Sequence, residues 1–163
     1  RQLYSTISEV CEGQKRSSDD AYENAAEPIS FSGFRILVVE DDMGSRRLLK
    51  EILDGNVATC EFVQNGQEAV DTLRSQSFDL CLMDVHMPVM DGYEATRQIR
   101  RQEETTGQHI AIIGLTAATM KHELDQCLES GMDAHMTKPV PLDLLRDKLS
   151  SLAERKARCG TAG

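Results

Sequence analysis

The stretch DLCLMDVHMPVMDGYEATRQIR, residues 79–100, contains a strand, a loop and the start of a helix, and this combination decides the fold. Residues 79–84 are nearly continuous in apolar side chains, as in a central strand that is covered on both faces. Asp91 is followed three residues later by Glu94, which is a pattern that opens helices. A buried strand that leads through a loop into a helix is typical of one unit of a parallel α/β sheet.

The same alternation of strand and helix patterns continues on both sides of this stretch. Asn65 followed by Glu68 resembles a capping box, Gly131 is typical of a helix end, and Pro141 suits the first turn of the last helix. The chain is therefore expected to contain five βα units. We expect strands over residues 35–40, 59–64, 79–84, 110–116 and 134–137. The first helix, over residues 44–54, is expected to place Leu48, Leu49, Ile52 and Leu53 on one face.

Length and composition limit the class of protein. The 163 residues fit one domain, which we place at residues 33–155, between a linker or partner-contacting tail at 1–32 and a C-terminal tail at 156–163. No stretch is apolar enough for a membrane helix or a signal peptide. The net charge of −9 argues against binding to nucleic acid. The 5 cysteines form no Cys-x-x-Cys pair, which favours reduced thiols of a cytoplasmic protein.

Polar residues stand at the carboxyl ends of the expected strands, which meet at one edge of a parallel sheet. Glu40 and Asp41 follow ILVV, Asp84 ends its strand, Thr116 follows IIGL, and Lys138 precedes Pro139. Clustered carboxylates repel one another unless a cation compensates, and oxygen ligands with open positions suit Mg²⁺, with Mn²⁺ as a substitute. A lysine and a threonine hydroxyl complete a cradle for a phosphoryl group, and an Asp beside such a cradle can form an aspartyl phosphate.

Residues 34–153 resemble the receiver domain of two-component response regulators, the phosphoacceptor module of histidine–aspartate phosphorelays. The resemblance is carried by four segments: RILVVEDD, residues 79–100, IIGLTA and GMDAHMTKP. Their form is most similar to that of receivers of hybrid sensor histidine kinases. The resemblance implies a doubly wound, flavodoxin-like (βα)5 fold with strand order 2-1-3-4-5.

The resemblance also implies a role for individual residues. Asp84 would accept the phosphoryl group, and Lys138, Thr116 and the amide of Ala117 would bind it. A cis peptide would join Lys138 to Pro139. The expected Mg²⁺ ligands are Glu40, acting mainly through water, Asp41, Asp84 and the backbone carbonyl of His86. Thr116 and His135 would form the switch pair, although relatives usually have Tyr or Phe in place of His135. Asp42, a third consecutive acid, is interpreted as a helix N-cap.

The expected partner is a histidine kinase dimerisation domain or a histidine phosphotransfer protein. It would dock on a small apolar patch formed by Met43, Ser45, Leu48, Val140 and Pro141. We expect no contact with a membrane and no turnover beyond phosphorylation and dephosphorylation of the chain itself. The acidic, linker-like start favours a piece of a hybrid kinase, as the cytoplasmic part of a membrane-anchored sensor. The alternative is a stand-alone response regulator that acts by protein–protein interaction.

Three rival interpretations account for the residues less well. A flavin- or nucleotide-binding protein needs a phosphate loop after its first strand, where this chain has EDDMGSRR. An aspartyl-phosphate phosphatase usually has a second Asp two residues after its nucleophile, and that position is His86. An interaction module that has lost phosphorylation would not require Asp41, Asp84, Thr116 and Lys138 together.

Overall fold

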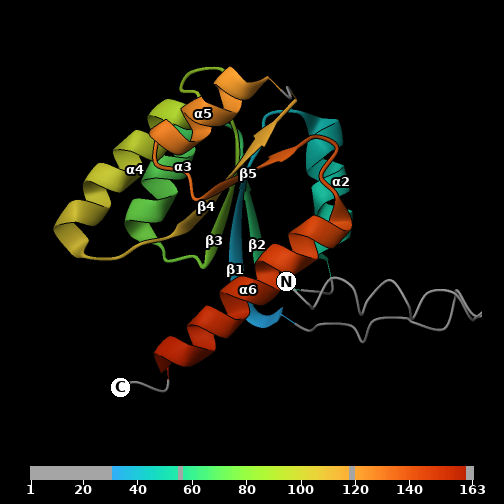
Figure 1. The fold of residues 1–163 in the computed structure, drawn as a ribbon, viewed down its shortest axis with the longest axis vertical. Helices are drawn as coiled ribbons and strands as arrows, with labels where there is room; N and C mark the ends of the chain where they lie inside the picture. Colours follow the sequence, from blue (N-terminus) through green and yellow to red (C-terminus); the bar gives the residue numbers. More distant parts are fainter. Residues whose placement is uncertain (1–30, 55–56, 118–119, 161–163) are drawn as a thin grey trace, which may run out of the picture.

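The computed structural model describes residues 31–54, 57–117 and 120–160, and the fold consists of strands and helices in alternation (Figure 1). Five parallel strands form one sheet in the order β2-β1-β3-β4-β5, which confirms the expected fold class and strand order. The strands are β1 (Phe31–Val39), β2 (Val57–Val63), β3 (Leu80–Asp84), β4 (Ala111–Thr116) and β5 (Ala134–Thr137). The helices are α2 (Met43–Leu53), α3 (Gly66–Ser75), α4 (Gly92–Thr106), α5 (Lys121–Glu129) and α6 (Leu142–Gly160).

Helices α2, α3 and α4 begin at side-chain caps. The Asp42 carboxylate accepts a hydrogen bond from the Ser45 amide at 2.7 Å, as expected of an N-cap. Asn65 accepts from the Glu68 amide at 2.9 Å. Asp91 accepts from the amide three residues later at 2.8 Å, so the expected start of α4 is confirmed. These caps fix where each helix leaves the carboxyl edge of the sheet.

The sheet separates two apolar clusters. Helices α3, α4 and α5 cover one face, and α2 and α6 cover the other (Figure 1). Alternate residues of one strand contribute to opposite faces: Leu37 and Val39 of β1 belong to the first cluster, while Ile36 and Val38 belong to the second. Each of these four side chains is completely buried, so β1 is covered on both sides, as a central parallel strand should be.

Some sequence expectations need correction. Leu48 is 44% exposed, whereas Leu49 and Leu53 lie in the core, because neighbouring helical residues point about 100° apart. Strand β1 begins at Phe31, before the expected domain start. Helix α6 continues to Gly160, so part of the segment expected as a C-terminal tail is helical. Residues 1–30, expected as a linker, lie outside the described residues, and the domain boundaries stay a prediction.

The start of α4 lies directly against the end of β3. A side chain at Gly92 would collide with the carbonyl oxygen of Asp84 and approach the Val85 Cα to 2.9 Å. The Gly92 amide also donates to the Val85 carbonyl at 3.0 Å. The absence of a side chain therefore allows α4 to begin beneath Asp84. Among the described residues, no helix is long and apolar enough to span a membrane.

Candidate functional site

Three carboxylates lie together at the carboxyl edge of the sheet. Glu40 and Asp41 follow β1, Asp84 ends the adjacent β3, and one oxygen from each lies within 4.8 Å of the other two. Glu40 has no exposed surface and Asp84 is 5% exposed, whereas Asp41 is open to solvent. The three side chains thus form a pocket of negative charge with one open side.

Lys138 lies against two of these carboxylates. Its Nζ is 2.6 Å from Oε2 of Glu40 and 3.2 Å from Oδ2 of Asp84. The Lys138 amide donates to the Thr116 carbonyl at 2.8 Å, and the Lys138–Pro139 peptide is cis, as the resemblance implied. A lysine from the end of β5 therefore supplies positive charge to acids from β1 and β3.

The two buried partners have perturbed pKa values. Burial raises the pKa of Glu40, the nearby Asp84 charge adds to the effect, and the bond to Lys138 opposes it. For Lys138, burial alone would lower the pKa, but the hydrogen bond to Glu40 and the charges of Asp84 and Glu40 outweigh it, so the pKa is raised. Lys138 is therefore held as a cation at neutral pH.

Thr116 and His86 meet a residue that the sequence did not indicate. Thr116 is buried and its hydroxyl donates to Oε2 of Glu123, in the first turn of α5, at 3.1 Å. The other oxygen of Glu123 lies 3.6 Å from Nε2 of His86. The His86 amide donates to Oδ1 of Asp84 at 3.3 Å. Glu123 could not be singled out in advance, because an acid in the first turn of a helix is common.

The remaining expected residues lie around this centre. Ala117 is exposed beside Thr116. His135 is half-buried in β5, where it pairs with Gly114 of β4, two positions before the last pair in the register of these two strands. The structure thus places Thr116 and His135 on adjacent strands, with His135 set back from the strand end.

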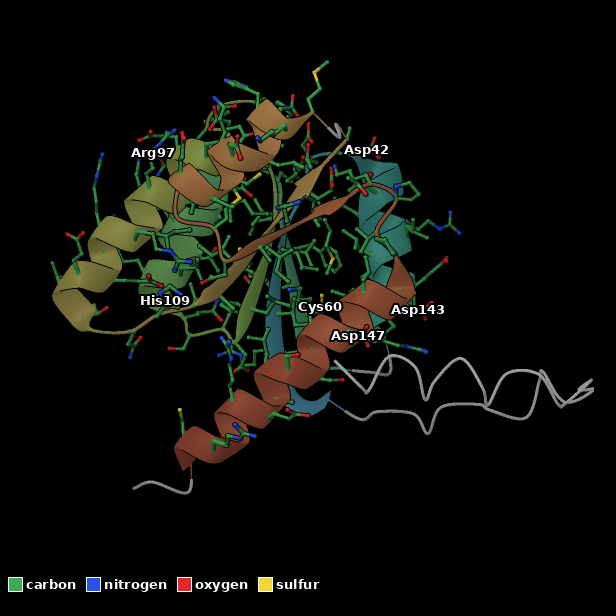
Figure 2. The ribbon with its side chains drawn as sticks, in the orientation of Figure 1. Asp42, Cys60, Arg97, His109, Asp143 and Asp147 are labelled. Carbon is green, nitrogen blue, oxygen red and sulfur yellow. The ribbon has the colours of Figure 1, made fainter. Side chains whose placement is uncertain are left out.

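Part of the expected docking patch lines a groove. A cavity of about 380 Å³ runs between the start of α2 and the segment after β5, and Ser45, Leu48 and Val140 line it beside Glu40 and Lys138. Met43 is 81% exposed but lines a different hollow, of about 440 Å³. Pro141 is half-buried and is not among the residues that line either one. Asp42, at the start of α2, marks this end of the sheet, whereas His109 lies at the opposite end (Figure 2).

The carboxylate cluster fits a hard divalent cation. Its donors are oxygen atoms only, and the exposed Asp41 leaves one side open for water or a ligand, as Mg²⁺ sites commonly do. The cluster contains carboxylates and no thiol, which speaks against a zinc-type site there. Lys138 neutralises part of the charge, which reduces the repulsion between Glu40 and Asp84.

Comparisons with known proteins agree with this arrangement. A model of the family "Response regulator receiver domain" matches residues 36–150. The sensor histidine kinase RcsC of Salmonella typhimurium is 41% identical over 120 residues, which make up 74% of this chain and 12% of that protein. The chain therefore spans only a small part of the curated relative that it matches.

Solved structures show the same fold at appreciable sequence identity. One is the receiver domain of the sensor histidine kinase PA1611 from Pseudomonas aeruginosa with a magnesium ion coordinated in the active site cleft (TM-score 0.66, 35% identity, covering 74% of this chain and 97% of that one). Another is the Saccharomyces cerevisiae co-crystal of the histidine phosphotransfer protein Ypd1 with the receiver domain of Ssk1 (TM-score 0.67, 31% identity, 72% and 86% covered). By fold, sequence and family match, the chain belongs to the response regulator receiver domains.

Proposed function

We propose that this domain is a Mg²⁺-dependent phosphoacceptor in a histidine–aspartate phosphorelay, with Asp84 as the acceptor. The observation that carries the proposal is the environment of Asp84. Its carboxylate lies at a strand end, 3.2 Å from the ammonium of Lys138 and within 4.8 Å of ligand atoms from Glu40 and Asp41. A nucleophile surrounded by compensating and ligating groups suits attack on an anionic phosphoryl donor.

The chain's own residues account for the transfer. An oxygen of Asp84 attacks the phosphorus of a phosphohistidine, an O–P bond forms, the P–N bond breaks, and its electron pair returns to the imidazole nitrogen. Lys138 would offset charge on the phosphoryl oxygens, and the Thr116 hydroxyl and the Ala117 amide would donate to them. Glu40, Asp41, Asp84 and the His86 carbonyl would hold Mg²⁺, which supplies charge neutralisation between the anionic donor and acceptor.

The partner is proposed to be a protein that presents a histidine. The Ssk1 receiver is seen with a histidine phosphotransfer protein, and the groove beside Lys138 offers an apolar surface next to the acceptor. The match to a short part of a sensor histidine kinase favours a parent chain of the hybrid kinase type. In such a chain, this domain would pass the phosphoryl group between kinase and relay protein.

Labelling by a small phosphoryl donor tests the proposal. Acetyl phosphate or phosphoramidate with Mg²⁺ should place one hydroxylamine-labile acyl phosphate on the wild-type chain, detected by intact mass. Asp84→Asn should remove it. Asp42→Asn is the matched control, because it removes a neighbouring acid while Asn can still cap α2. Labelling that persists in Asp84→Asn, or in excess chelator, would contradict the proposal.

A further inference from the structure

Glu123 joins two residues at the mouth of the site. One of its oxygens accepts the Thr116 hydroxyl at 3.1 Å, and the other lies 3.6 Å from Nε2 of His86. The Glu123 side chain is 24% exposed, and Thr116 has no exposed surface. The hydrogen bond between Thr116 and Glu123 is therefore largely shielded from water, which makes it stronger than an equivalent bond at the surface.

The backbone around Thr116 is fixed on both sides. The Thr116 carbonyl accepts from the Lys138 amide at 2.8 Å, and the preceding Leu115 carbonyl accepts from the Val85 amide at 3.1 Å. Leu115 also pairs with Asp84 in the sheet register. Any redirection of the Thr116 hydroxyl therefore has to come from rotation of its side chain rather than from movement of the strand.

The second contact of Glu123 ties it to the segment after Asp84. The His86 ring meets Tyr93 of α4 edge-on, with ring centroids 6.4 Å apart and planes at 88°. Tyr93 is itself 7% exposed and belongs to the core beneath α4 and α5. Glu123 therefore connects the end of β4 with the acceptor loop and, through it, with the start of α4.

A hydroxyl has a single proton, so it makes one full hydrogen bond as a donor. Under the proposed function, Thr116 donates to a phosphoryl oxygen on Asp84. In the present structure the same proton is given to Glu123. The phosphoryl group and the Glu123 carboxylate thus compete for it.

We propose that Glu123 is a positioning residue that retains the Thr116 hydroxyl proton in the unphosphorylated domain and gives it up when Asp84 is phosphorylated. This inference rests on the proposed phosphoacceptor function. It implies that phosphorylation breaks the hydrogen bond that links Thr116 of β4 to Glu123 of α5. The free energy of that bond in the unphosphorylated domain is therefore subtracted from the binding free energy of a phosphoryl group. Glu123 would thereby couple the acceptor to α5 without touching the phosphoryl group.

Binding of beryllium fluoride in the presence of Mg²⁺ measures this competition, because the adduct imitates an acyl phosphate without turnover. Glu123→Ala should bind the probe roughly fivefold more tightly than wild type, the ratio expected from loss of one shielded hydrogen bond. Thr116→Val removes the hydroxyl, and with it the proton for which Glu123 and the probe compete. In that background, Glu123→Ala should tighten binding much less, because only the loss of charge repulsion remains.

The charge of Glu123 needs a separate control, since any nearby carboxylate repels an anion. Glu123→Gln removes the charge but keeps an acceptor oxygen, so it should tighten binding less than Glu123→Ala. Melting temperatures of all variants, measured without the probe, report any purely structural effect. If Glu123 had a purely structural role, its substitution would change the melting temperature. Its effect on probe affinity would then be the same with and without the Thr116 hydroxyl.

The outcomes separate this inference from the proposed function. Equal tightening by Glu123→Ala in wild type and in the Thr116→Val variant would reduce the effect to charge repulsion and overturn the inference, as would no tightening at all. If the wild type binds the probe and Asp84→Asn does not, the phosphoacceptor assignment stands whatever Glu123 does. If wild type and Asp84→Asn behave alike, the proposed function itself fails.

Discussion

The carboxylate of Glu40 has no exposed surface, and its Oε2 atom lies 2.6 Å from Nζ of Lys138. A charge buried to this extent is stable only with its partner, and removal of one member of such a pair is usually more costly than removal of both. The relationship between these two residues therefore links the chemistry of the site to the stability of the fold.

The first prediction concerns pH. The pKa of Glu40 is raised by burial, so the folded protein binds this proton more tightly than the unfolded chain does. The resulting contribution to stability is complete below the unfolded pKa and is lost as pH rises through the folded pKa. In chelator, the unfolding free energy of wild type relative to Glu40→Gln should fall as pH rises above about 4, the ordinary pKa of a glutamate. Urea titrations at a series of pH values measure it, and a constant difference would contradict the prediction.

The second prediction concerns the metal. A cation that binds only the folded state stabilises it by mass action, and at about 100 times the dissociation constant the gain is about 2.7 kcal/mol. Mg²⁺ should therefore raise the melting temperature of wild type. Asp41→Asn should lose most of this increase, because Asp41 is the exposed member of the carboxylate cluster. Asp42→Asn should keep it, and equal responses of the two variants would place the metal elsewhere.

The third prediction concerns docking. Leu48 is 44% exposed in the groove beside Lys138, so Leu48→Glu should slow transfer from a phosphorylated histidine phosphotransfer protein by about tenfold. Phosphorylation by a small donor needs no docking and should be unchanged. Leu128→Glu is the matched control, since Leu128 is 54% exposed on α5. Slower labelling by both donors would indicate damage to the site instead.

The fourth prediction concerns the expected pair of Thr116 and His135. If redirection of the Thr116 hydroxyl lets the His135 ring move, phosphorylation should shift amide signals along α5, β5 and α6. Thr116→Ala should still be phosphorylated, although more slowly, and should lose these shifts. Thr116→Ser is the control, because it keeps the hydroxyl. Shifts that persist unchanged in Thr116→Ala would contradict the coupling.

The fifth prediction concerns Arg100, which binds the segments that lead into the amino ends of β4 and β5. Its guanidinium donates to the carbonyls of Gly131 at 2.8 Å and Ile110 at 2.9 Å and pairs with Glu103 and Asp133 at 2.7 Å each. Because the side chain is only 17% exposed, Arg100→Met should lower the unfolding free energy by about 3 kcal/mol.

Arg97 of the same helix provides the control for that loss. Its bond to Glu94 is 3.1 Å long, but the two side chains are 47% and 42% exposed. Arg97→Met should therefore change the unfolding free energy by less than about 1 kcal/mol. Similar losses for Arg97→Met and Arg100→Met in urea unfolding would show that the buried network is no more important than a surface pair.

The sequence was most informative where a local rule acts alone. Asp42, Asn65 and Asp91 cap helices through bonds to residues three positions away, so the caps could be predicted from spacing. The acids at strand ends were predictable because a parallel sheet places those ends at one edge, and the structure brings Glu40, Asp41 and Asp84 together there.

Long-range contacts were less accessible. Leu48 was expected with Leu49 on a buried face, but which of two adjacent leucines is buried depends on the packing of α2 against the sheet and α6. Glu123 was missed because its role depends on how α5 is oriented over β4, and no spacing in the sequence encodes that. The length of α6 was underestimated because ERKARCG has good helix formers but no apolar face to mark it.

Helices pack on two sides of the sheet, and each side makes a different contact with the end of the sheet that carries Asp84. The groove next to α2 and the contact of Thr116 with α5 both touch the acceptor end, yet their helices pack into different apolar clusters. Substitutions that are far apart and share no partner usually have additive effects. Under the proposed function, changes on the α2 side would therefore alter which histidine protein is accepted, and changes on the α5 side would alter how strongly the domain responds. Selection could then tune recognition and response one at a time.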